Sequence, residues 1–82
     1  MDRFKQIESF VSAVVRGSLS AAARSEGVAP AVIGRRIDAL EARLGVKLLI
    51  RTTRKISLSA EGTGFFEECQ QILQTLENAE NS

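Results

Sequence analysis

The sequence contains no histidine, tryptophan or tyrosine, and it has one cysteine, Cys69, and one proline, Pro30. Without histidine the chain lacks the commonest general base and the commonest metal ligand. A single cysteine forms no intrachain disulfide, and without histidine it builds neither a zinc finger nor a Cys/His nucleophile pair. We therefore expect no enzymatic activity, no metal and no cofactor.

Long apolar runs are also missing. No apolar stretch approaches the ~20 residues of a membrane-spanning helix, and the first residues lead into an amphipathic pattern instead of a signal peptide. We expect a cytoplasmic protein with no membrane partner. The chain of 82 residues has room for one domain with a modest core, so a second copy would help to bury apolar surface.

The net charge of +1 conceals a division of charge along the chain. Residues 1–59 hold all eleven Lys and Arg with five acids, whereas residues 60–82 hold five Glu and no base. Seven of the bases lie between Arg35 and Lys55. The basic part predicts contact with an anionic polymer such as a nucleic acid, and the acidic part predicts a different task.

Hydrophobic spacing predicts three helices in the basic part. Apolar residues recur at helical spacing over residues 3–16, and a glycine ends this helix. Ser20 offers a side-chain cap for a short second helix over residues 21–26. Pro30 suits the first turn of a third helix, which Gly45 ends.

The third helix has two distinct faces. An inward apolar stripe is formed by Ile33, Ile37, Leu40 and Leu44. The residues on the opposite side are Ala31, Gly34, Arg35 and Asp38. A short helix, a glycine-containing turn and a helix with a basic outer face are the organisation of a helix-turn-helix, whose last helix enters the DNA major groove.

Short β-prone runs follow Gly45. Residues 48–50 and 56–58 flank the polar and basic segment 51–55, which predicts a small hairpin with a basic tip. Such a hairpin beside a helix-turn-helix is a wing.

A fourth helix is predicted after Ser59, which offers a capping hydroxyl. A heptad stripe runs along this helix and comprises Phe65, Cys69, Ile72, Leu76 and Ala79. With Phe66 and Leu73 beside it, the apolar face is wider than one short helix buries, which predicts a homodimer; folding of the stripe back onto its own domain is the alternative. Gly62 and Gly64 weaken the first turns and would allow a hinge.

Four stretches carry a family resemblance: Gly17–Ala23, Ile37–Gly45, Leu48–Arg54 and Leu58–Gly62. Together they are similar to the amino-terminal winged helix-turn-helix of the LysR-type transcriptional regulators. The resemblance implies a mainly α fold, with three helices and a small β-hairpin wing followed by a long linker and dimerisation helix. The resemblance also implies a winged domain over residues 1–59 and a linker helix over 60–82. Family members are usually several times longer, so a small-molecule effector is expected only for a further domain.

The resemblance implies sequence-specific binding of double-stranded DNA, as a dimer with antiparallel fourth helices on a near-palindromic operator. The DNA-binding residues that the family pattern implies are Pro30, Ala31, Gly34, Arg35 and Arg54. Position in the predicted helix and hairpin adds Arg36, Arg51, Thr53 and Lys55. The expected dimerisation residues are Phe65, Phe66, Cys69, Ile72, Leu73 and Leu76. A protein-interaction module and a non-specific DNA-binding protein are the alternative functions.

Four positions depart from the family pattern. Ala29 replaces a capping Ser or Thr before the third helix. Pro30 and Gly34 stand where Gln and Ser are common, which shifts base readout towards Arg35. Glu26 stands where a buried Leu is typical, so this site is either more exposed or holds a buried acid. Glycine inside a helix costs ~1 kcal/mol relative to alanine, which close approach to DNA would offset at Gly34; a neutral substitution at this position is the alternative.

Overall fold

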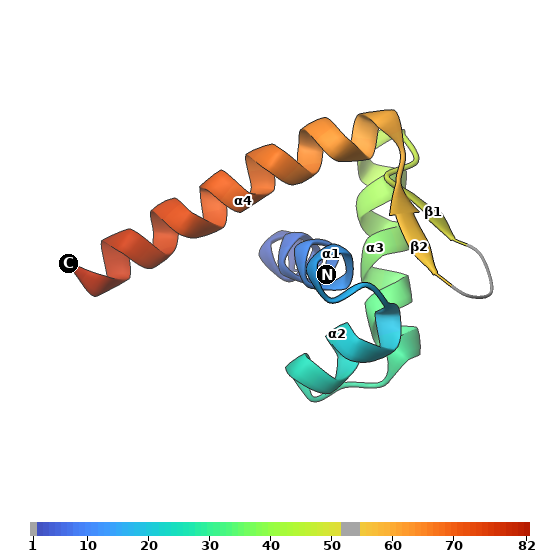
Figure 1. Cartoon of the computed structure of the whole chain (residues 1–82), viewed down its shortest axis with the longest axis horizontal. Coiled ribbons are helices and arrows are strands. Elements are labelled where there is room, and N and C mark those ends of the chain that lie inside the picture. Colours follow the sequence, from blue (N-terminus) through green and yellow to red (C-terminus); the bar gives the residue numbers. More distant parts are fainter. Residues whose placement is uncertain (1, 52–54) are drawn as a thin grey trace.

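The structure is a computed structural model that describes residues 2–51 and 55–82. This part of the chain forms four helices and a two-stranded sheet (Figure 1). In chain order the elements are α1 (Arg3–Arg16), α2 (Leu19–Glu26), α3 (Pro30–Leu44), β1 (Leu49–Arg51), β2 (Ile56–Leu58) and α4 (Ala60–Asn81). The mainly α, winged architecture predicted from the sequence is confirmed. In Figure 1 the hairpin lies beside α3 at the right of the molecule, and α4 runs from the hairpin to a free end at the left.

The helix ends follow from capping chemistry, with one difference from the prediction. Ser18, and not Ser20, caps α2, because the extended backbone at Ser18 lets its hydroxyl accept a hydrogen bond from the Ala21 amide at 3.0 Å. Helix α2 therefore begins at Leu19. Helix α3 lacks a side-chain cap, as predicted, because Ala29 occupies the capping position.

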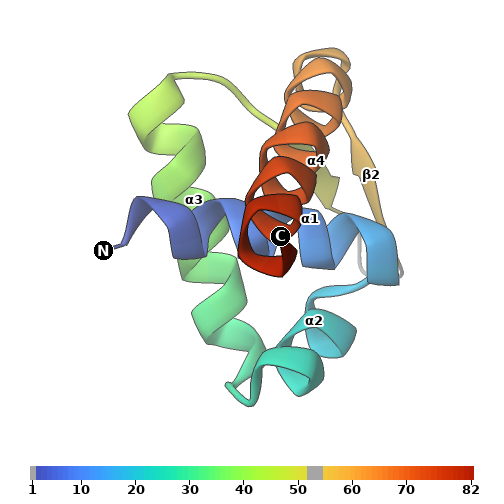
Figure 2. The same cartoon turned by 90° about the vertical axis from the view of Figure 1, so that its left-hand side faces the viewer.

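The core is formed where α1, α2 and α3 meet, and Figure 2 shows α1 running across the molecule between α3 and α4. Phe10 of α1 is fully buried, and its ring centroid lies 5.7 Å from that of Phe65 and 6.2 Å from that of Phe66. Ala22 and Ala23 are also buried, and their small side chains allow α2 to approach its neighbours closely. The start of α4 thus shares one core with the winged part.

The root of the hairpin is fixed to the end of α3. The buried carboxylate of Glu41 accepts hydrogen bonds from the amides of Leu48 and Leu49 at 2.8 and 3.1 Å. The antiparallel strands pair Leu49 with Leu58, and the Ser59 amide donates to the Leu48 carbonyl at 2.9 Å. These bonds satisfy the buried backbone groups at the root and set the direction in which the hairpin leaves α3.

Gly62 is a point of close packing, which corrects the expectation of a hinge. The Ser59 hydroxyl accepts a hydrogen bond from the Gly62 amide at 2.9 Å and so caps α4, as predicted. A Cβ atom built on Gly62 would collide with the carbonyl of Leu48, whereas one built on Gly64 meets nothing within 4 Å. Glycine at position 62 therefore lets α4 press against the hairpin root, and this contact opposes swivelling.

The two halves of α4 have different surroundings. Cys69 is fully buried among side chains of its own chain, whereas Ile72 is 51% exposed and Leu76 is 40% exposed. The predicted dimerisation stripe is therefore divided, and the structure places Cys69 in the core of its own chain instead of on a seam open to a partner.

Within the described residues, no helix is long and apolar enough to cross a membrane.

Candidate nucleic-acid interface

The outer face of α3 presents Arg35 to solvent. Pro30 and Ala31, in the first turn of α3, are also exposed, and Ala31 lies one turn before Arg35 on the helix. No residue of 2–51 or 55–82 forms a hydrogen bond or ion pair with the Arg35 guanidinium. Arg35 therefore keeps its positive charge and its five N–H donors available for an external anion or acceptor.

Arg36, although adjacent in sequence, points into the domain. Its guanidinium donates to the Glu26 carboxylate at 3.0 Å and to the Ser9 hydroxyl at 3.2 Å. The Ser9 hydroxyl donates to Glu26 in turn, at 3.1 Å, and the Arg36 and Glu26 side chains are each only 18% exposed. This network joins α1, α2 and α3. The structure thus places Arg36 away from the predicted DNA face and shows that the acid at position 26 is a largely buried carboxylate, paired with Arg36.

Arg43, in α3, and Lys47, just after it, each have a partner in the chain. Arg43 donates to the side-chain oxygen of Gln6 at 2.9 Å. The Lys47 ammonium lies 3.8 Å from the Glu41 carboxylate that holds the hairpin root, and the Lys47 side chain is 73% exposed. Neither base is among the predicted DNA-binding residues.

Arg51 reaches from β1 back to α3. Its guanidinium Nη2 lies 2.8 Å from Oδ1 of Asp38. Gly34 is buried beneath this arginine: a Cβ atom at Gly34 would lie 3.9 Å from Arg51 Nη1 and 3.9 Å from Leu19 Cδ1. Gly34 was expected on the outer face, so this is a correction, because the surface at that point consists of the Arg51 and Leu19 side chains.

Of the three predicted DNA-binding residues at the tip of the hairpin, the structure describes one. Lys55 is exposed just before β2. Thr53 and Arg54 lie outside the described residues. Sequence reasoning did not foresee that Asp38 would hold Arg51 or that Glu41 would hold the hairpin root. The signal for both was an acid within a strongly basic stretch, since such acids often have a specific partner.

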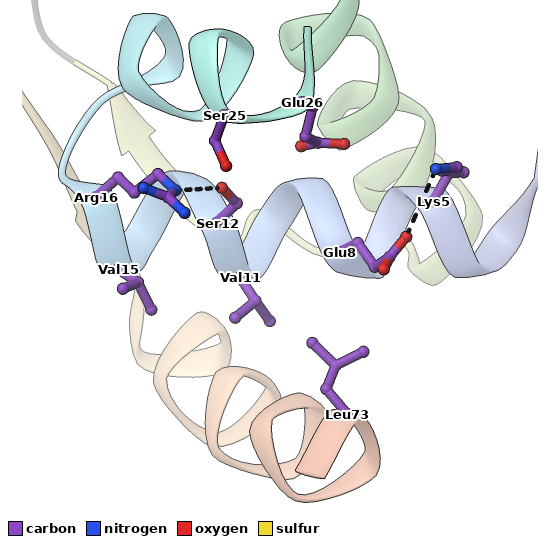
Figure 3. Close-up of a pocket in the computed structure, with 9 residues that line it drawn as sticks. All are labelled: Lys5, Glu8, Val11, Ser12, Val15, Arg16, Ser25, Glu26 and Leu73. Carbon is purple, nitrogen blue, oxygen red and sulfur yellow. Dashed lines mark hydrogen bonds and ion pairs between the residues drawn. The ribbon is translucent and has the colours of Figure 1, made fainter. Parts of the chain in front are cut away.

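A pocket of about 410 Å³ lies between α1, the end of α2 and α4. Figure 3 shows Val11 and Val15 pointing toward the side of α4 that carries Leu73. Its polar rim includes two pairs, Lys5 with Glu8 at 3.9 Å and Arg16 with Ser12 at 3.1 Å. No group of three or more metal-ligating side chains occurs in the described parts of the chain. The pocket is an open groove between helices, with Val11, Val15 and Leu73 on its apolar side and charged or hydroxyl side chains along the rest of its lining.

Helix α2, the turn after it and α3, with a hairpin fixed beside α3, define a winged helix-turn-helix. The family model for bacterial regulatory helix-turn-helix proteins of the lysR family matches residues 4–63. The chain therefore belongs to the LysR-type family. This agrees with the resemblance carried by the sequence motifs.

Two relatives illustrate how far the similarity extends. An HTH-type transcriptional repressor of Pseudomonas aeruginosa is 40% identical over 80 residues, which cover 98% of this chain and 25% of that protein. The HTH-type transcriptional regulator CrgA of Neisseria meningitidis is 42% identical over 76 residues, covering 93% of this chain and 25% of that protein. The chain spans about a quarter of the length of these curated relatives.

Solved structures of DNA complexes have the same fold. The DNA-binding domain of CbnR in its DNA complex is 37% identical, with a TM-score of 0.88 and coverage of 99% of this chain and 92% of that one. The DNA-binding domain of BenM bound to catB site 1 DNA is 27% identical, with a TM-score of 0.91 and coverage of 99% and 89%. The arrangement of α1 to α4 is therefore that of domains that have been solved on DNA.

Proposed function

We propose that this chain binds double-stranded DNA in a sequence-specific manner, as the DNA-binding segment of a dimeric transcriptional regulator. The observation that carries the proposal is the state of Arg35. It is exposed on the outer face of α3 without a partner among the described residues, while its neighbour Arg36 is held by Glu26. An arginine in this position of a helix-turn-helix is suited to the edge of a guanine.

The proposed contacts divide between the helix and the hairpin. The first turns of α3, with Pro30 and Ala31 at the tip, enter the major groove and bring Arg35 to a base edge or a phosphate. The hairpin residues Thr53, Arg54 and Lys55 contact phosphate or a minor groove beside it. Support comes from the DNA complexes of CbnR and BenM, whose DNA-binding domains share the fold of this chain.

The proposed dimer is held by α4. Its second half exposes Ile72 and Leu76 on one stripe, with Phe65 half-buried at the start of the same stripe. An antiparallel pair of these helices buries that stripe and carries two copies of α3 to half-sites about one helical turn of DNA apart, or a multiple of it. Residues 1–59 then act on DNA and residues 60–82 set the spacing.

The action proposed here is binding and not catalysis, and the compartment that follows from a DNA ligand is the cytoplasm of a bacterium. In the longer relatives, residues beyond this segment make up about three quarters of the protein. Any small-molecule effector is assigned to such a further domain and not to residues 1–82.

The test is a mobility shift with fragmented genomic DNA over a range of salt concentrations. The proposal predicts retardation of a subset of fragments, with affinity falling steeply as salt rises, because binding releases counterions from the phosphates. Equal retardation of all fragments would contradict sequence-specific binding. No retardation at low salt would contradict DNA binding altogether.

A further inference from the structure

The ion pair between the hairpin and α3 lies on the same surface as Arg35. Arg51 is the last residue of β1, and its guanidinium extends over α3 to Asp38, 2.8 Å away. The Arg51 side chain is 29% exposed and that of Asp38 is 61% exposed, so the pair borders solvent. In Figure 1 the hairpin and α3 lie on the side of the molecule opposite to the free end of α4.

Gly34 provides the room for this arrangement. A Cβ atom at this position would make an ordinary van der Waals contact with the Arg51 guanidinium, 3.9 Å away, and only a longer side chain would enter the space that Arg51 fills. The backbone of Gly34 is helical, and its φ is not among the positive values found at Gly17, Gly27 and Gly45. Backbone strain therefore gives no reason for glycine here, and alanine would also fit, but a larger side chain would compete with Arg51 for the same space.

An exposed acid on a surface that meets DNA is unfavourable by itself, because it repels phosphate. Of the two acids in α3, Glu41 is buried and paired with the hairpin root, so Asp38 is the exposed one. Asp38 accepts from Arg51 through one oxygen. A guanidinium has five N–H donors, and the donors of Arg51 that do not face Asp38 remain able to bind an acceptor on DNA.

We propose that Asp38 is a positioning residue, which holds Arg51 across Gly34 so that a hairpin arginine contacts DNA as part of the surface of α3. The contact is a hydrogen bond from the guanidinium to an acceptor on the duplex, either a base edge or a phosphate oxygen. This inference rests on the proposed DNA-binding function. It assigns Asp38 an action through Arg51 and no contact with DNA of its own.

The test is a double-mutant cycle of Asp38→Ala and Arg51→Ala, measured as affinity for a selected duplex. Charge alone predicts that Asp38→Ala tightens binding, because a negative charge is removed. Positioning predicts the opposite sign, a loss of about 5- to 10-fold, and a double variant no weaker than Arg51→Ala, because the two residues act as one unit. Glu67→Ala, which removes an exposed acid from α4, is the matched control and should not weaken binding.

Base preferences of the variants separate the two kinds of acceptor. Loss of preference at one operator position, shared by Asp38→Ala and Arg51→Ala, would assign the contact to a base edge. A lower salt slope with unchanged preferences, again shared by both variants, would assign it to a phosphate. Asp38→Asn keeps an acceptor oxygen and should lose less affinity than Asp38→Ala.

Tighter binding by Asp38→Ala, or effects of the two substitutions that simply add, would overturn the inference. The proposed function is judged separately by the unmodified chain. If that chain binds DNA and Asp38→Ala binds it more tightly, the inference fails and the function stands. If the unmodified chain binds no DNA, the function fails first. Thermal unfolding of each variant shows whether it is folded, and both side chains border solvent, so we expect folded variants.

Discussion

Cys69 and Ile72 lie one turn apart on the same apolar stripe of α4, yet the first is fully buried and the second is 51% exposed. The first half of α4 packs against α1 and the hairpin root, so Cys69 belongs to the core of the winged part. The second half extends beyond that core. Regular apolar spacing shows which side chains favour burial, and the length of the neighbouring elements decides whether the same chain can bury them.

The largest effect is expected on the exposed stripe in the second half of α4. Ile72→Glu would place a charge on the exposed stripe of both copies in the proposed dimer, and loss of the two isoleucine side chains buried there would alone weaken association by on the order of 100-fold or more. Sedimentation should then show monomers at concentrations where the unmodified chain is dimeric. Gln70→Glu, at an exposed position of the same helix, adds the same charge and should remain dimeric. A dimeric Ile72→Glu variant would show that the stripe packs elsewhere.

The packed half of α4 should respond in the opposite way, through folding and not association. Gly62→Ala introduces a Cβ that collides with the Leu48 carbonyl, so we expect the free energy of unfolding to fall by about 3 kcal/mol. Gly64→Ala has open space and should raise the free energy of unfolding by up to about 1 kcal/mol, since alanine favours a helix. Denaturant unfolding measures both. Equal effects of the two substitutions would contradict a fixed contact between α4 and the hairpin root.

Arg35 and Arg36 offer a second contrast, between an external and an internal role. Arg35→Ala should weaken DNA binding by about 2 kcal/mol without loss of stability, because Arg35 has no partner among residues 2–51 and 55–82. Arg3→Ala removes the same charge from the start of α1 and serves as the control. A binding titration in which Arg35→Ala matches the control would remove Arg35 from the interface.

The buried thiol should have the smallest effect at neutral pH, and its contribution should appear only in alkaline solution. Burial raises the pKa of Cys69 from 9.0 to about 11, and the nearby Glu68 carboxylate adds to the rise. Because the unfolded thiol loses its proton at lower pH, the folded state binds more protons between these values, and the free energy of unfolding falls as pH rises from 9 to 11. The slope should approach about 1.4 kcal/mol per pH unit. Well below pH 9 the thiol contributes no slope, because it is protonated in both states. Comparing Cys69→Ala with the unmodified chain by denaturant unfolding isolates this contribution.

The helices and the hairpin could be predicted from the sequence because hydrophobic period, glycine and proline act locally. The bounds of α1 and α3 follow from Gly17, Pro30 and Gly45 in this way. The cap of α2 was wrong by two positions, because Ser18 and Ser20 are chemically equal and only the extended backbone at Ser18 distinguishes them.

The site could be predicted less completely, because its contacts join residues far apart in the chain. Helical spacing placed Arg35 on the outer face correctly. It could not show that Glu26 and Ser9 would take up Arg36, or that Arg51 would cover Gly34, since both depend on how α2 and the hairpin pack against α3. The distribution of charge along the sequence indicated the basic region. Only the tertiary contacts show which of its cations are paired inside the chain and which remain available to an external ligand.

In the proposed complex, two copies of α3 read DNA at a spacing set by α4. Selection of bound duplexes from a random pool tests this most directly, because it examines binding, specificity and symmetry together. The predicted result is one short motif that occurs twice in inverted orientation, with centres about 10 base pairs or a multiple of it apart. A pool that stays random would contradict sequence-specific binding, and a motif that occurs only singly would contradict the dimer.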